Sequence, residues 1–131
     1  MSLLETLKAM RLKASLKRAR FELRYAPEGE QPVSVGELKY DGKMWTFAYA
    51  DDYKQRHDLR PIEGFDDLDR VYRSSLLFPF FAVRIPDVGR NDVRMKLAKH
   101  RVHEPEATDL LKIFGRRVVS SPAFELIPHG S

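Results

Sequence analysis

The chain has 131 residues, of which 43% are hydrophobic and 32% charged, with a formal net charge of +4 and no cysteine. This length and composition indicate a single globular domain. The lack of cysteine excludes disulfides, thiolate metal sites and thiol nucleophiles. No stretch reaches the roughly 18 apolar residues that a membrane helix needs, so we expect a cytoplasmic protein that does not bind a membrane.

The positive charge is concentrated at the N-terminus. Residues 1–24 carry seven Lys or Arg against two Glu, a net +5, whereas the remaining residues sum to −1. Apolar residues recur at helical steps from Leu3 to Ala14, so residues 1–20 are predicted to form a basic amphipathic helical arm. Such an arm either packs by its apolar stripe or contacts nucleic acid or an acidic partner. The candidate contact residues are Lys8, Arg11, Lys13, Lys17, Arg18 and Arg20.

Residues 21–50 have the two-residue period of strands. A change of phase at Gly36 predicts a β-bulge, and Asp41-Gly42 predicts a two-residue hairpin turn. We therefore expect a three-stranded antiparallel meander, or partial barrel, with one aromatic face. The alternating apolar positions are Phe21, Leu23, Tyr25, Val33, Val35, Leu38, Tyr40, Trp45, Phe47 and Tyr49.

Residues 51–73 are strongly charged and predict a solvated connection. Single helical turns are expected near Asp51–Gln55 and Asp66–Arg73, and in the second turn Leu68, Val71 and Tyr72 would share a face.

Three short helices and a final strand are predicted after residue 73. Ser74 or Ser75 would cap a helix with Pro79 in its first turn, and Asn91 or Asp92 would cap the next. The third would run from Pro105 to a stop at Gly115, ahead of the strand-like run "AFELI".

The predicted fold class is α+β: a small antiparallel meander, then a cluster of short helices and a C-terminal strand, preceded by a basic helix. The domain is expected to span residues 21–128, and residues 129–131 to form a tail.

The sequence contains no convincing catalytic constellation. There is no phosphate-binding Gly-rich loop. His100 and His103 are three residues apart, but no further ligands are near them, so we expect no metal. The acid pairs at residues 51–52 and 66–67 lie in polar stretches without the burial that acid–base chemistry requires. We therefore expect no enzyme activity and no cofactor.

Five segments carry a resemblance to a known family. In their order and spacing they resemble the N-terminal subdomain of the HipA family, the serine/threonine kinase toxins of HipA–HipB toxin–antitoxin systems. The segments are "VGELKYDG" (35–42), "WTFAYADDY" (45–53), "FPFFAVRIPD" (78–87), "DLLKIFGRR" (109–117) and "FELIP" (124–128).

The chain also departs from the family pattern. "RPIEGFDDLD" replaces the family's Pro-Leu-Ser-Leu-Ser-Leu-Pro segment, and Ala82-Val83 stands where the family has Asp-Asn. The catalytic-loop aspartate and metal-binding asparagine of a kinase core are not expected in this chain, and phosphoryl transfer needs both.

The resemblance implies a regulatory or antitoxin-like role. In the family this subdomain caps the kinase lobe and touches a HipB-type DNA-binding protein, and in split systems a small HipS-like protein carries it separately. We therefore expect docking on a separate HipA-like kinase core, with a HipB-like helix-turn-helix protein as a further partner. The alternative is nucleic-acid binding by the basic N-terminal helix, which would depend strongly on salt.

The stretch "FPFF" raises the question of whether its phenylalanines are core or docking surface. Phe80, Phe81 and Ile85 are expected in the core, because a small domain needs its large apolar residues inside. The docking surface is instead expected in residues 60–73. Its candidate anchors are Phe65, Leu68 and Tyr72, since aromatic groups on polar loops are typical interface hot spots.

Overall fold

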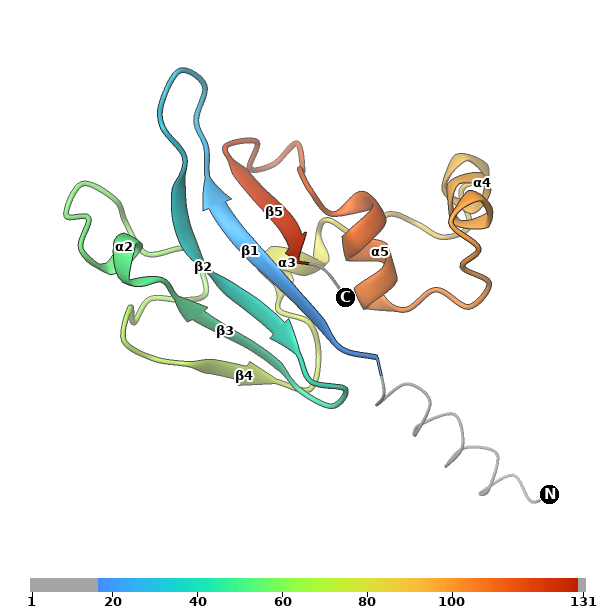
Figure 1. Cartoon of the computed structure of the whole chain (residues 1–131), viewed down its shortest axis with the longest axis horizontal. Coiled ribbons are helices and arrows are strands. Elements are labelled where there is room, and N and C mark those ends of the chain that lie inside the picture. The colour runs from blue at the N-terminus through green and yellow to red at the C-terminus, as the bar shows by residue number, and fades with distance from the viewer. Residues whose placement is uncertain (1–16, 130–131) are drawn as a thin grey trace.

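The computed structural model of the chain describes residues 17–129. Within these residues, five strands form one antiparallel sheet in the order β4-β3-β2-β1-β5, with short helices beside it (Figure 1). The predicted α+β class is therefore confirmed. The strands are β1 (Ala19–Tyr25), β2 (Val33–Tyr40), β3 (Trp45–Tyr49), β4 (Tyr72–Ser74) and β5 (Phe124–His129), and the helices are α2 (Asp51–Lys54), α3 (Pro79–Ala82), α4 (Asn91–Lys99) and α5 (Ala107–Phe114).

The two faces of the sheet differ in character. The apolar positions of the alternating strands form an inner face that is buried in the main core. Phe81 of α3 belongs to the same core, so α3 lies over this inner face, behind the sheet in Figure 1. The outer face carries mainly charged side chains, and none of the described helices packs over it (Figure 1).

The hairpin between β2 and β3 forms where it was predicted, but its loop is longer. Tyr40 pairs with Trp45, so the loop has four residues from Asp41 to Met44 rather than two. The Asp41 carboxylate accepts hydrogen bonds from the backbone N–H groups of Lys43 and Met44, both at 2.8 Å. This side-chain cap stabilises the longer loop, which the Asp-Gly pair alone did not predict.

The predicted bulge is confirmed beside Gly36. Leu23 of β1 pairs with Gly36, whereas the next residue pairs with Ser34, which leaves Val35 as the extra residue. A Cβ atom at position 36 would lie 2.5 Å from the carbonyl oxygen of Ala48 on β3. The glycine therefore allows β2 and β3 to approach closely at the bulge.

The connection from residue 55 to 71 is more ordered than a solvated loop. The helix predicted at Asp66–Arg73 is wrong, because this stretch forms turns and then β4. Ile62 and Phe65 of the connection are buried. The Tyr49 hydroxyl explains their position, since it donates to the Phe65 carbonyl and accepts from the Ile62 N–H at 2.9 Å. Two backbone groups of the loop thus find partners inside the core.

The three short helices after residue 73 are confirmed, with shifted starts. Pro79 is the first residue of α3, and Phe78, not a serine, precedes it. Helix α5 begins with a capping box between Glu106 and Asp109 and ends at Gly115. A second, smaller core joins the last two helices and consists of Val93, Leu97 and Leu110.

The structure corrects both predicted domain boundaries. Strand β1 begins at Ala19, which is buried, so the predicted helical arm cannot reach residue 20. His129 pairs with Arg20 in the sheet and is not part of a tail. The remainder of the predicted arm, residues 1–16, lies outside the described residues.

Replacing Tyr49 with Phe is expected to lower the free energy of unfolding by about 1–3 kcal/mol at neutral pH, because two buried backbone groups lose their partner. Burial raises the pKa of Tyr49 from 10.0 to about 12. The stabilising contribution of its protonated hydroxyl is therefore complete below pH 10 and disappears as the pH rises through about 12. Urea unfolding followed by Trp45 fluorescence should show that the free energy of unfolding falls less at alkaline pH in the variant than in the wild type. If the free energy of unfolding changed with pH in the same way in both proteins, the stabilising role given to the Tyr49 hydroxyl would be contradicted.

Arg101 should be replaceable by Gly with a gain in stability. Its φ of 58° places it in the left-handed region just after α4, where Gly is favoured. Arg101→Gly is expected to raise the free energy of unfolding by about 1 kcal/mol, whereas Arg101→Ala, which keeps a Cβ atom, should give no such gain. Thermal unfolding compares the two, and an equal gain in both variants would refute the backbone explanation.

Candidate docking site

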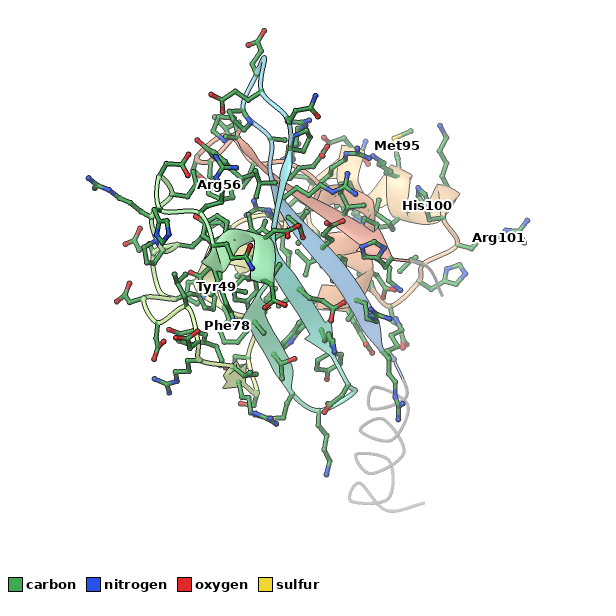
Figure 2. The ribbon with its side chains drawn as sticks, turned by 60° about the vertical axis from the view of Figure 1, so that its left-hand side comes forward. Tyr49, Arg56, Phe78, Met95, His100 and Arg101 are labelled. Atoms are coloured by element: carbon green, nitrogen blue, oxygen red, sulfur yellow. The ribbon has the colours of Figure 1, made fainter. Side chains whose placement is uncertain are left out.

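An apolar groove of about 510 Å³ lies between α3, the connection around residue 64 and the turn before β5. Phe78, labelled in Figure 2, marks its place on the molecule. Aromatic and aliphatic groups dominate its surface, as is usual both in ligand pockets and at protein-docking sites. The groove is lined by Glu63, Gly64, Phe65, Phe78, Pro79, Phe80, Val83, Ser120 and Ser121.

The stretch "FPFF" supplies both core and groove. Pro79 starts α3, and the helical turn then sends Phe81 into the main core, where it is fully buried. Phe78 and Phe80 are half-buried and line the groove. The prediction of a core role is thus confirmed for Phe81, whereas Phe80 and Ile85 only pack against the core from its edge.

Phe65 forms the floor of the groove and is not an exposed anchor. Only 2% of its surface is accessible, so it is not on the exposed loop surface where the sequence placed it, although it lines the groove. Its ring lies edge-on to those of Tyr72, at 5.0 Å between centroids, and Phe78, at 5.2 Å. Leu68 and Tyr72, the other two predicted anchors, are half-buried and pack against the main core. The sequence did not reveal this burial, because the surrounding residues are acidic.

Two apolar side chains reach solvent at or next to the rim of the groove. Val83, at the end of α3, is 58% exposed, and Val119, next to the groove-lining Ser120, is 96% exposed. Sequence reasoning missed both residues. For Val119 the available signal was its position: it follows Val118 directly before the Ser-Ser-Pro turn at residues 120–122, where packing inside a core is unusual.

Arg84 supports the groove from within. Its guanidinium donates to the carbonyl oxygens of Phe80, at 2.9 Å, and Phe124, at 3.3 Å, and lies 5.0 Å from the centre of the Phe80 ring. Burial lowers the pKa of Arg84 to about 10. Arg84 therefore joins α3 to β5 and fixes the ring of Phe80. A sign of this role is visible in the sequence, since Arg84 is the only charged residue between Phe78 and Ile85.

The titratable residues considered from the sequence do not converge. The acid pairs at residues 51–52 and 66–67 are exposed, as are His100 and His103 (His100 is labelled in Figure 2). Within residues 17–129, no group of three or more His, Cys, Asp or Glu side chains is placed to bind a metal ion.

The basic residues predicted to contact a partner separate into three groups. Lys17 forms ion pairs with Asp109 and Glu106 of the α5 capping box, and so connects the start of the sheet to α5. Arg18 and Arg20 line a second hollow at the start of β1. Lys8, Arg11 and Lys13 lie outside the described residues.

No family model, curated protein or solved structure matches this chain. Among residues 17–129, none of the helices has both the length and the apolar character required to cross a membrane.

Arg84→Ala is expected to lower the free energy of unfolding by about 2 kcal/mol or more, because it removes a buried side chain and its bonds to two carbonyl groups. Arg60→Ala, at an exposed arginine, serves as the control and should change stability by less than about 0.5 kcal/mol. Urea titration measures both variants. A change of equal size in the two would mean that Arg84 does not support the groove.

Proposed function

We propose that this chain is a non-catalytic regulatory module that docks on a separate HipA-like serine/threonine kinase core through the apolar groove. The observation that carries this proposal is the combination of a fixed aromatic floor with an exposed apolar rim. Phe65 and Phe80 are held in place by surrounding rings and by Arg84. Val83, which lines the groove, and Val119, the sequence neighbour of the groove-lining Ser120, are exposed to water.

The energetics of such a surface favour an interface. Covering apolar area releases about 25 cal/mol for each Å² removed from water. Because the floor of the groove is already packed, a partner side chain that enters it orders few groups of this chain, and the entropic cost of binding is small. A cluster of aromatic residues surrounded by weaker contacts is also the usual composition of an interface hot spot.

The family resemblance supplies the partner. The segments that resemble the HipA subdomain coincide with β2, the β3–α2 stretch, the α3 region, the end of α5 and β5. One groove wall, Phe78 to Phe80, belongs to a resembling segment, whereas the wall at residues 63–65 belongs to "RPIEGFDDLD", which departs from the family. On this proposal the shared wall defines the type of partner, and the divergent wall selects one particular kinase.

Val83→Asp and Val119→Asp are each expected to weaken binding to a HipA-like kinase core from the same genome by at least about tenfold, because each places a charge at an apolar interface. Both side chains are exposed, so the melting temperature should stay unchanged. Biolayer interferometry with the immobilised kinase core gives the affinities.

Met95→Asp is the matched control for this pair of variants. Met95 is 65% exposed on α4, far from Phe78 in Figure 2, and should tolerate the same substitution without loss of binding. If both valine variants bound the kinase core with the affinity of the wild type, the groove would be ruled out as the docking site. Absence of any binding between the wild-type chain and the kinase core would reject the proposed partner.

A further inference from the structure

A row of basic side chains crosses the outer face of the sheet. The strand register places Arg73 of β4 opposite Thr46, Thr46 opposite Lys39, Lys39 opposite Arg20, and Arg20 opposite His129. Residues that are paired across strands point to the same face, so these five side chains form one line. We call this line the cationic row. It spans all five strands, or about 19 Å at the usual strand spacing of about 4.8 Å.

The centre of the cationic row is hollowed and accessible. Arg20, Lys39, Thr46 and His129 line a hollow of about 500 Å³, together with Arg18 from the segment before β1. The side chains of Arg20 and Lys39 are 64% and 54% exposed. Basic groups therefore surround a concave surface that a ligand of opposite charge can reach.

Two glutamates next to the row position its basic groups through ion pairs but do not neutralise its net positive charge. Glu37 bonds Arg20 at 2.8 Å and Lys39 at 3.1 Å, and Glu22 lies 3.5 Å from His129. Ion pairs this exposed contribute less than about 1 kcal/mol, so a stronger anion can replace them. Positive charge is in excess, because five basic side chains face three acidic ones. They are Arg18, Arg20, Arg24, Lys39 and Arg73 against Glu22, Glu37 and Asp41. The fourth acidic residue of this face, Glu125 opposite Arg24, is paired with Arg116 and Arg117.

The outer face favours one class of polyanion. Single-stranded nucleic acid is normally bound by stacking its bases on aromatic side chains. The aromatic residues of these strands belong to or pack against the main core, and Tyr40 at the rim of the hollow packs in a tilted arrangement against Trp45, with 4.6 Å between ring centroids. Unpaired bases would therefore find no free stacking platform here. A duplex needs none, since it presents its phosphates outward.

We propose that the cationic row binds the sugar–phosphate backbone of duplex DNA without reading its sequence. This site is distinct from the apolar groove, because α3 lies over the inner face and the row lies on the outer face (Figure 1). The module can thus bind a protein partner and DNA at the same time.

The test is fluorescence anisotropy of a labelled DNA duplex of about 20 base pairs of arbitrary sequence, titrated with the full chain between about 50 and 200 mM NaCl. Lys39→Glu and Arg73→Glu are each expected to weaken binding at low salt by about tenfold. Each should also make the slope of log affinity against log salt shallower by about 1, because one phosphate contact is lost. The matched control is Lys99→Glu, which makes the same change of charge on the exposed surface of α4.

Full retention of binding by Lys99→Glu, with unchanged melting temperatures for all variants, completes the expected result. An equal loss in Lys99→Glu would show that only net charge matters and would overturn the proposal. Binding that both row variants leave unchanged would place the contact elsewhere on the chain. Tighter binding to a single-stranded oligonucleotide or to an acidic peptide such as polyglutamate would assign the row to another class of ligand, and no binding at 50 mM salt would exclude it altogether.

Discussion

The packing of the Phe65 ring is the contact on which most of this structure depends. Phe65 comes from a charged connection, yet its ring lies within 4.7 Å of that of Phe47 in β3 and within 6.0 Å of that of Phe81 in α3, measured between centroids. It thereby attaches the connection and α3 to the inner face of the sheet. Aromatic pairs in such tilted and edge-on arrangements add about 0.5–1.5 kcal/mol each beyond the area they bury. Without this ring the groove would have neither a floor nor a fixed wall.

Two exposed surfaces of different character follow from this single layer of packing. Because α3 and the connection cover only the inner face, the outer face stays exposed and carries the cationic row. The apolar rim lies with α3 on the covered side. A small domain cannot bury every apolar group, and two of the exposed large hydrophobic side chains of the described residues, Val83 and Val119, lie at the groove or next to a residue that lines it. The sheet thus separates the apolar groove from the cationic row.

The sequence predicted the elements that local patterns control. Alternation identified the three central strands, Gly36 located the bulge, and Gly115 located the end of α5. Local patterns failed where tertiary contacts determine the structure of a segment. The spacing of Leu68, Val71 and Tyr72 suggested a helical turn over residues 66–73, whereas the Tyr49 hydroxyl holds the neighbouring backbone inward and the chain then enters β4.

The two surfaces differ in how far the sequence revealed them. The groove is built by residues far apart in the chain, such as Gly64, Phe80 and Ser121, so no single stretch could disclose it. The cationic row was partly visible as basic residues near the N-terminus, but Lys39 and Arg73 join it only through strand pairing. Register, which depends on the complete sheet, was the missing information.

Amide hydrogen exchange of the wild-type chain, with and without the HipA-like kinase core, tests docking through the groove most directly. The account predicts slower exchange in residues 78–83 and 118–121 when the kinase core is bound, with unchanged exchange in α4. Protection confined to α4 or to the outer strands, with α3 and the 118–121 turn unaffected, would contradict it.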